Sequence, residues 1–323
     1  MKRKLLLLAE GNNLNFIRDL IPVMEDYFEL RISNVSDSKI LEIDYEWSEI
    51  IWLEWAAQLS IDISNRKKTK IVILRLHSYE YFCGFYSQIN WNNIDELIFV
   101  GKNIKDYIVD NTFKSQYSTN VHVIHNSVNT VRFALKTKPP NKKLAVITTL
   151  RHCKNIPLLL QCFANLLKFD SCFTLHIAGD YQNWDSPHIQ MENTEIKHYI
   201  SHLVTELKLN DKIFFEGAIG DVNSWLDDKT YIISTSLREG MPVNILEAMS
   251  KGLLPVIHNF PGVNQFYPDK YIFNTVEEFT YKIINTKIES LLYRSYIVKN
   301  FSHSKIEVIY RDLFKYASNL SLK

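Results

Sequence analysis

Two glutamates eight positions apart are the residues of this sequence best suited to hold a ligand. Glu239 and Glu247 lie in the stretch STSLREGMPVNILEAMSKGLLPVIHN, residues 234–259. Pro242 suits the first turn of a helix, where its missing N–H costs nothing, and Gly252 suits the end of one. The stretch therefore predicts a helix over about 242–251 that begins just after Glu239.

The N-terminus of this helix is suited to an anion such as a diphosphate, because its first N–H groups lack intrahelical partners and the helix dipole favours negative charge. Side chains lean toward the helix N-terminus, so Glu247, one turn after Val243, would accept hydrogen bonds from ribose hydroxyls beside that anion. Glu239 would reach the next part of the ligand. In the alternative reading, Glu239 is a loop carboxylate and Glu247 an exposed helix position. The residues around the expected N–H groups are Gly240, Met241, Val243 and Asn244.

Strand-like and helical segments alternate along the chain. KLLLLAE at 4–10 and KIVILRL at 70–76 read as strands, and IIWLEW at 50–55 is apolar enough to be buried on both faces, as parallel strands are. In the second half LAVITTL, FTLHIAG, KIFFEG, TYIISTS and LPVIHN alternate with helical segments. This alternation predicts an α/β fold with doubly wound parallel sheets. The lysine- and proline-rich run KTKPPNKK at 136–143 reads as a linker, so we expect domains at 1–135 and 144–323.

Glycines and charged residues follow the predicted strands. LAVITTL is followed by Arg151-His-Cys-Lys154, TYIISTS by Leu-Arg-Glu239-Gly, and KIVILRL by His77. Ligands of open α/β sheets bind outside the carboxyl ends of the strands. The pattern therefore predicts a binding site at that edge, in a cleft between two domains.

Composition excludes several other classes of protein. At 323 residues the chain is too long for one ordinary core, and its 37 basic and 36 acidic residues give no field that points to nucleic acid. No apolar run approaches the ~18–20 residues of a membrane span, and LLLL at 5–8 reads as a first strand. The four cysteines show no metal-binding spacing, so we expect no metal site. Since no signal peptide is recognised, we expect them to be reduced thiols in a cytoplasmic protein. They are Cys83, Cys153, Cys162 and Cys172.

EGMPVNILEAMSKGLLPVI closely resembles the E-G-x-P-x-x-x-x-E-A-M-x-x-G-x-P-V-V signature of the family 4 retaining glycosyltransferases, which have the GT-B fold. Ordered similarities run from about 121 to 316, and the first domain matches only weakly. The segments that carry them are HVIHNSVNTVRF, LRHCKNIPLLLQCFANL, LHIAGD, LKLNDKIFFEGAIGDVNSWL and FSHSKIEVIYRDLF. The resemblance implies an acceptor-binding first domain and a second domain that binds a nucleotide sugar. It leaves open that the last helix, about 303–318, packs back on the first domain.

The resemblance also implies roles for individual residues. Glu247 would bind the donor ribose, Glu239 the sugar hydroxyls, and Lys154 the departing diphosphate. A cation is unfavourable at a helix start, which favours a functional Lys154 over a surface one. His77 would lie beside the transferred sugar, although a lone histidine is often structural. Further donor contacts are implied for Gly217 near the base, for Gly240, Met241 and Pro242 near the sugar, and for Gly11 in a first loop with a single glycine.

Three departures from the family pattern stand out. Thr149 occupies the position of an arginine five residues before the lysine, so either Arg151 supplies the second cation or the diphosphate is held less tightly. N-G-V-D appears as Asn126-Ser-Val-Asn129, and Gln265 replaces a carboxylate. None of these changes removes the two glutamates or Lys154, so activity is still expected, with an unusual donor preference as one consequence.

The resulting expectation is a retaining, metal-independent glycosyltransferase that needs no cofactor and uses a nucleotide-diphosphate sugar. The acceptor would be a saccharide or lipid-linked saccharide in bacterial surface polysaccharide synthesis. The alternatives are a sugar-phosphate synthase of the same fold, or a non-catalytic partner in a polysaccharide complex. A basic N-terminus and an apolar helical set would allow peripheral contact with the inner membrane, although core packing also explains that set. The set comprises Phe16, Leu20, Met24 and Phe28.

Overall fold

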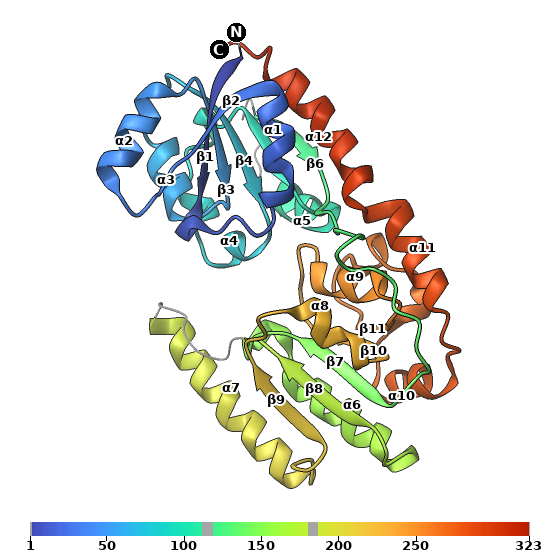
Figure 1. Cartoon of the computed structure of the whole chain (residues 1–323). Helices are drawn as coiled ribbons and strands as arrows, with labels where there is room; N and C mark the ends of the chain where they lie inside the picture. The colour runs from blue at the N-terminus through green and yellow to red at the C-terminus, as the bar shows by residue number, and fades with distance from the viewer. Residues whose placement is uncertain (1, 112–118, 180–186, 323) are drawn as a thin grey trace. The chain divides into compact units, whose positions relative to one another are not determined.

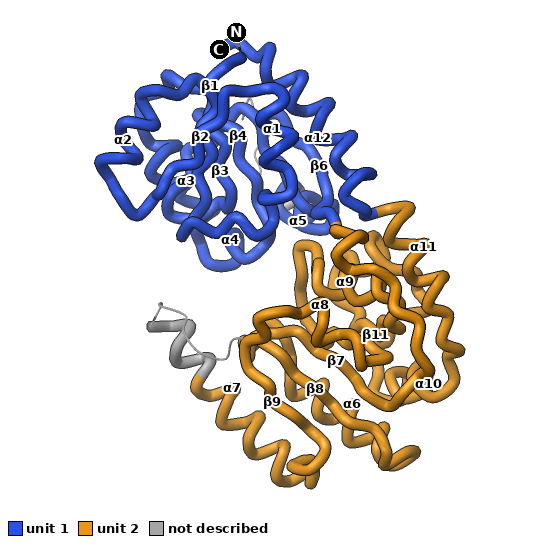
Figure 2. Tube along the Cα trace, viewed as in Figure 1, with its two compact units in different colours: residues 1–127, 301–323 blue, residues 128–300 orange. Residues whose placement is uncertain are grey.

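Two six-stranded parallel sheets organise the chain, one in each of two units (Figure 1). The structure, a computed structural model, describes residues 2–111, 119–179 and 187–322. Unit 1 contains residues 1–127 and 301–323, and unit 2 contains residues 128–300 (Figure 2).

The sheet of unit 1 has the strand order β2-β1-β3-β4-β5-β6, with every pair parallel. Its central strands are rich in leucine, isoleucine and valine, which suits strands whose two faces both lie in hydrophobic clusters. The strands are β1 (Arg3–Ala9), β2 (Phe28–Ile32), β3 (Ile50–Glu54), β4 (Ile71–Leu76), β5 (Glu96–Phe99) and β6 (Asn120–Val123). The helices are α1 (Ile21–Tyr27), α2 (Ser38–Trp47), α3 (Gln58–Ser64), α4 (Tyr79–Phe82), α5 (Lys102–Asn111) and α12 (His303–Ala317).

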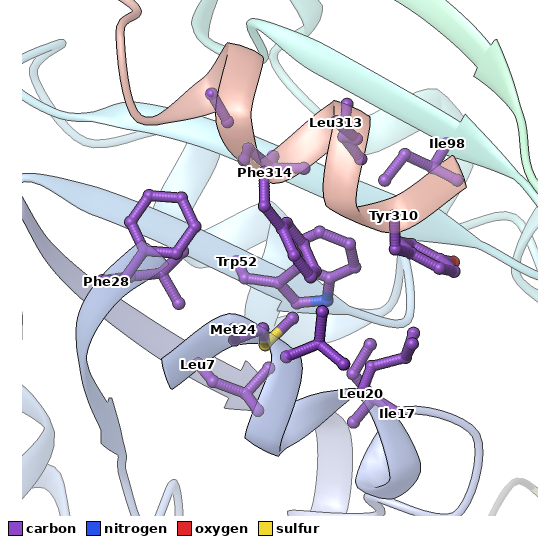
Figure 3. Close-up of a cluster of buried hydrophobic side chains, with 14 of the residues drawn as sticks. Leu7, Ile17, Leu20, Met24, Phe28, Trp52, Ile98, Tyr310, Leu313 and Phe314 are labelled. Carbon is purple, nitrogen blue, oxygen red and sulfur yellow. The ribbon is translucent and has the colours of Figure 1, made fainter. Parts of the chain in front are cut away.

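The last helix of the chain packs against the sheet of unit 1, as the sequence left open. Tyr310 and Phe314 of α12 lie against Trp52 of β3, with ring centroids 6.2 and 5.9 Å apart, and α1 lies beside them (Figure 3). Three members of the apolar set from the first helical segment, Leu20, Met24 and Phe28, are buried in this same core. The core-packing interpretation of that set is therefore correct, and the membrane-contact interpretation is wrong for these three residues.

Unit 2 repeats the design with the strand order β12-β11-β10-β7-β8-β9, again all parallel. The helix α6 buries an apolar face and contacts both α7 and α10. The strands are β7 (Lys143–Ile147), β8 (Thr174–Ala178), β9 (Ile213–Gly217), β10 (Tyr231–Ser234), β11 (Leu254–His258) and β12 (Ile272–Phe273). The helices are α6 (Ile156–Phe169), α7 (Pro187–Glu206), α8 (Val222–Trp225), α9 (Val243–Ser250), α10 (Val276–Asn285) and α11 (Ser290–Phe301), whose last residue belongs to unit 1.

Residues 136–143, read from the sequence as a linker, lie within unit 2. Their lysines attach the segment to the turn after α8: Lys136 Nζ is 2.6 Å from Asp227 Oδ2, and Lys143 Nζ is 2.7 Å from Asp228 Oδ2. Lys138 donates to the carbonyl of Asp227, and burial lowers its pKa to about 8. The domain boundaries at 135 and 144 stay predictions, and the chain passes between the units at 127/128 and 300/301.

The helix expected over about 242–251 is α9, which is slightly shorter at both ends. Pro242 has an extended conformation, with ψ near 90°, and is the N-cap residue rather than a first-turn residue. Lys251 caps the C-terminus, and Gly252 follows with a φ of +92°, a conformation that favours glycine.

Candidate functional site

The candidate site of unit 2 is built from the loops that follow β7 and β10 and from the start of α9. Two hydrogen bonds join the loops: the Thr235 hydroxyl donates to the carbonyl of Lys154 at 3.0 Å, and the N–H of Leu237 donates to that of Cys153 at 2.8 Å. The side-chain amide of Asn244 donates to the carbonyl of Ile147 at 2.7 Å, which holds the first turn of α9 to the end of β7. Residues far apart in sequence therefore meet at the carboxyl edge of this sheet.

Lys154 and Glu239 form an ion pair in this site. Lys154 Nζ lies 2.5 Å from Glu239 Oε1, and the Ser236 hydroxyl donates to the same oxygen at 2.6 Å. The two side chains are 26% and 15% exposed, so the pair is partly shielded but reachable from solvent. The residues predicted to bind the diphosphate and the sugar are thus adjacent, each neutralising the other.

Glu247 is held in a different way. Its side chain is half-buried in α9, and within the described part of the chain no donor hydrogen-bonds to its carboxylate. Burial raises the pKa of Glu247 to about 7, and the positive charge of Arg132 lowers it only in part. An ionised carboxylate in this environment is short of hydrogen-bond donors, which hydroxyl groups of a ligand would supply.

The start of α9 presents backbone donors at the same edge. Val243 and Asn244 occupy its first turn, where N–H groups have no partner within the helix. Gly240, Met241 and Pro242 lead into this turn and are buried, and the Tyr267 hydroxyl donates to the carbonyl of Pro242 at 3.2 Å. These contacts fix the direction in which the helix begins.

The loop after β7 contains Thr149, which stands where an arginine was expected, and Arg151, the cation that could replace it. The Thr149 hydroxyl is buried and forms no hydrogen bond with the described residues. Arg151 precedes η5 (His152–Lys154), a turn of 3₁₀ helix that ends at Asn155 with a φ of +49°. Arg151 and Lys154 therefore lie one short turn apart, between β7 and α6.

Two glycines end neighbouring strands of this sheet for different reasons. Gly217, at the end of β9, has a φ of +70°, and a Cβ there would meet no atom within 4 Å. Its backbone conformation alone thus explains the glycine. At Gly179, after β8, a Cβ would lie 1.6 Å from the carbonyl oxygen of Thr148, so no side chain fits. The sequence showed a glycine here without the reason for it, and the aspartate of LHIAGD, Asp180, lies outside the described residues.

His77 and Gly11 belong to unit 1. His77 follows β4 and is 7% exposed, with its Nε2 2.9 Å from Glu54 Oε1. Gly11, with a φ of +57°, lies in a short turn after β1 that is held by Asn12, whose side chain bonds Asn34 and Val35. The backbone conformation of this loop explains its glycine, since no atom lies within 4 Å of a Cβ at Gly11.

Around His77 the structure shows residues that the sequence reading did not single out. Glu54 and Arg75 are opposite each other in the register of β3 and β4, and Arg75 Nη1 lies 2.8 Å from Glu54 Oε1. Both side chains are at most 1% exposed. An acid and a base inside two otherwise apolar strands, IIWLEW and KIVILRL, were the available signal, but only the strand register pairs them.

The described residues contain neither a cluster suited to a metal ion nor a helix suited to span a membrane. In ranges 2–111, 119–179 and 187–322, no three histidine, cysteine or acidic side chains come together as a metal site would require. Nor does any described helix combine the length and apolar character of a membrane span.

Comparisons with known proteins agree with this architecture. The family model described as "Glycosyl transferases group 1" matches residues 127–302, a little more than half of the chain. Over 142 residues the chain is 27% identical to the alpha-monoglucosyldiacylglycerol synthase of Streptococcus pneumoniae, which corresponds to 43% of this chain but only 29% of that enzyme.

Two solved structures extend the comparison beyond the matched segment. Anabaena Alr3699/HepE, solved in complex with UDP and glucose, has a TM-score of 0.74 at 13% identity, over 97% of this chain and all of that one. A variant of S. aureus TarM, solved with fondaparinux, alpha-GlcNAc-glycerol and UDP, has a TM-score of 0.66 at 19% identity, over 82% of this chain and 55% of that one. The expected GT-B fold, with its two parallel-sheet units, is confirmed.

Proposed function

The chain belongs to the glycosyl transferases group 1, and we propose that it transfers a sugar, with retention of configuration, from a nucleotide-diphosphate sugar to a hydroxyl acceptor. The observation that carries the proposal is the arrangement in unit 2: the Lys154–Glu239 pair and the half-buried Glu247 both flank the start of α9. A diphosphate needs a cation, which Lys154 would supply. The hydroxyl groups of the ribose and of the sugar need acceptors, which Glu247 and Glu239 would supply.

The proposed reaction needs no covalent enzyme intermediate. The bond between the anomeric carbon and the diphosphate oxygen breaks, and the acceptor oxygen forms a new bond on the same face. The acceptor proton passes to the departing phosphate oxygen. Lys154, the N–H groups at the start of α9 and, in place of the arginine expected at Thr149, Arg151 stabilise the charge that develops there. This set of donors makes a metal ion unnecessary in the proposal.

Binding of the donor would rearrange the Lys154–Glu239 pair. Lys154 gains the diphosphate as a partner, and Glu239 becomes available to accept from sugar hydroxyls while it keeps the Ser236 hydrogen bond. We propose that His77 orients the sugar as well. The proposed donor is a UDP-sugar, because UDP is bound in structures of similar fold, Anabaena Alr3699/HepE and S. aureus TarM.

The acceptor is proposed to be a saccharide or a lipid-linked saccharide used in bacterial surface polysaccharide. A lipid acceptor is supported by the similarity to the alpha-monoglucosyldiacylglycerol synthase of Streptococcus pneumoniae, although the chain spans under a third of that enzyme. In this proposal the protein works in the cytoplasm and meets the acceptor at the membrane surface.

The proposal is tested by titrating the protein with UDP and by following the hydrolysis or transfer of UDP-sugars in the presence of EDTA. We expect saturable binding and slow turnover that EDTA does not abolish. Lys154→Ala should reduce turnover at least about 100-fold, since loss of one preorganised charge at a developing anion costs about 2.7–4 kcal/mol.

Lys142→Ala is the matched control. Lys142 is also ion-paired, with Asp170 Oδ2 at 2.5 Å, but it immediately precedes the amino end of β7, at the opposite edge of the same sheet. It should retain wild-type turnover. Full activity of Lys154→Ala, or no binding of any nucleotide sugar by the wild-type protein, would contradict the proposed function.

A further inference from the structure

We propose that Glu54, with Arg75 as its counter-charge, is a positioning residue that fixes which nitrogen of His77 faces the substrate. The inference rests on the proposed function, because it assigns a supporting role to residues that do not touch the sugar. It concerns unit 1 alone and is carried by the contacts around the His77 ring.

Both carboxylate oxygens of Glu54 accept hydrogen bonds from donors of its own unit. Oε1 accepts from Arg75 at 2.8 Å and lies 2.9 Å from His77 Nε2, and Oε2 accepts from the indole of Trp52 at 3.1 Å. Arg75 also donates to the side chain of Asn126 and, at 3.2 Å, to the carbonyl of Phe16. The carboxylate is therefore locked by β3, β4 and the segment after β6.

Glu54 is anchored to the core as well. The Trp52 ring that donates to it packs between Tyr310 and Phe314 of α12 and Met24 of α1 (Figure 3). A movement of the carboxylate would disturb this packing. The orientation of the His77 ring is thus coupled to the hydrophobic core that α12 forms with the sheet of unit 1.

The electrostatics keep Glu54 ionised. Burial alone would raise the pKa of Glu54, but the Arg75 guanidinium and the hydrogen bond from His77 outweigh it, so the pKa lies below its ordinary value. An ionised carboxylate only accepts hydrogen bonds, so His77 Nε2 must carry a hydrogen. Arg75 balances the charge of Glu54, so His77 need not be protonated for this purpose. In the neutral ring, Nδ1 is then the acceptor.

The ring is also held by aromatic contacts. Trp55 stacks on His77 with centroids 3.9 Å apart and an angle of 24°, and Phe16 lies 5.1 Å away. Trp55 has a φ of +79°, which is strained for a residue other than glycine, and its indole donates to the carbonyl of Asn13 at 3.1 Å. Backbone strain at a residue that is fixed on both sides is typical of a functional site.

His77 Nδ1 makes no hydrogen bond with the described residues, although the side chain is only 9% exposed. Nδ1 is not one of the fully buried polar atoms, so solvent reaches it and it can accept a hydrogen bond from a ligand. With Nε2 protonated, Nδ1 accepts from a hydroxyl group of the transferred sugar. Glu54 would therefore determine whether the substrate meets an acceptor or a donor.

The first test is the tautomer of His77, measured by ¹⁵N NMR on protein labelled at histidine, with the His77 signals assigned by comparison with His77→Gln. We expect nitrogen shifts that place a hydrogen on Nε2, as the contact with Glu54 requires. A ring protonated at Nδ1 alone would overturn the inference. This measurement needs no substrate, so it is informative even if no nucleotide sugar is turned over and the proposed function fails.

The second test replaces the buried pair with apolar residues in the double variant Glu54→Met, Arg75→Met, which leaves no unpaired buried charge. We expect a fall in turnover of about 10- to 100-fold with an unchanged dissociation constant for UDP, as for other residues that orient a functional histidine. When the same change is made in a His77→Ala background, it should reduce turnover no further. A wild-type rate in the double variant, or an undiminished effect in the His77→Ala background, would overturn the inference.

Glu96→Gln is the matched control, because Glu96 is a second buried glutamate of unit 1 that bonds a histidine. Its Oε2 lies 2.6 Å from His122 Nε2, but it begins β5 and so lies at the amino edge of the sheet. Glu96→Gln should keep wild-type turnover. If the methionine variant does not fold, the tautomer of the wild-type protein alone decides the inference.

Discussion

Two glutamates, Glu54 of unit 1 and Glu247 of unit 2, are held in opposite ways. Glu54 in unit 1 is surrounded by three donors of its own chain, Arg75, His77 and Trp52, and its pKa lies below the ordinary value. Glu247 in unit 2 accepts no hydrogen bond from the described residues, and burial raises its pKa to about 7. Both residues lie at or near the carboxyl edge of a parallel sheet.

The difference separates two uses of a buried carboxylate. A fully buried carboxylate whose two oxygens already accept from the protein fixes its neighbours and is out of reach of a ligand. A carboxylate without donors costs stability in the free protein and regains it when hydroxyl groups arrive. We therefore assign orientation of His77 to Glu54 and recognition of a ligand to Glu247.

The largest expected effect is on donor binding by Glu247→Ala. Its dissociation constant for UDP should rise about 100-fold, since two hydrogen bonds from ribose hydroxyls to a charged acceptor are worth about 1.5–3 kcal/mol each before losses. Isothermal titration calorimetry measures this, with melting curves as a check on folding. Glu54→Gln should bind UDP as the wild type does, because Glu54 accepts only from its own chain. If the wild type, Glu247→Ala and Glu54→Gln bound UDP with equal affinity, Glu247 would have no special role in recognising the ligand.

The second prediction concerns thermal stability at pH 8, which Glu247→Gln should raise and Glu54→Gln should lower. The pKa of about 7 for Glu247, against an ordinary 4.5, corresponds to a cost of about 3 kcal/mol for the ionised form. Because the folded pKa is the higher one, this cost develops as pH rises from 4.5 to 7 and is complete at pH 8. Glu247→Gln should therefore melt a few degrees higher than the wild type.

Glu54→Gln should melt lower at the same pH. Its folded pKa is depressed, so its stabilising effect is fully present above the ordinary carboxylate range and is lost only in acid. The substitution leaves the Arg75 charge buried without its partner, which costs about 3–5 kcal/mol. Thermal unfolding of the two variants side by side checks both signs. Destabilisation by Glu247→Gln would show that its carboxylate is satisfied in the free protein.

Local features of unit 2 could be predicted from the sequence. The turn, the helix and the two glutamates lie within about a dozen residues, and short-range rules place them, apart from Pro242, which caps α9 instead of entering it. Strand positions agree to within one to three residues at each end, because buried parallel strands have unbroken apolar runs.

Pairings between distant segments could not be predicted. Lys154 and Glu239 are 85 positions apart, and Glu54 meets Arg75 only because β3 and β4 pair in that register. The lysines of 136–143 looked like those of a solvated linker, yet their partners, Asp227 and Asp228, come some 85–91 positions later. Such contacts depend on the sheet order, which a single sequence does not specify.

The third prediction uses pH to distinguish the two carboxylates. Affinity for a UDP-sugar should fall as pH drops below about 7, by up to about tenfold per pH unit, because protonated Glu247 loses one acceptor oxygen and its charge. A UDP-sugar is preferred to UDP as the probe, since it has no terminal phosphate that titrates in this range. Glu247→Gln should flatten the profile, whereas Glu54→Gln should leave its midpoint in place. A wild-type profile without a midpoint near 7 would contradict the assignment.

The smallest effect is expected at Glu239, which lies between the two extremes because its own chain supplies Lys154 and the Ser236 hydroxyl. Ser236→Ala removes one of these donors and should lower turnover about fivefold, the equivalent of one hydrogen bond of about 1 kcal/mol. UDP affinity should stay constant, since the hydroxyl acts on the carboxylate that faces the sugar. Steady-state rates with a UDP-sugar, compared with UDP titrations, separate the two quantities. A loss of UDP affinity with an unchanged rate would place Glu239 in the nucleotide site instead, so it would share the role of Glu247.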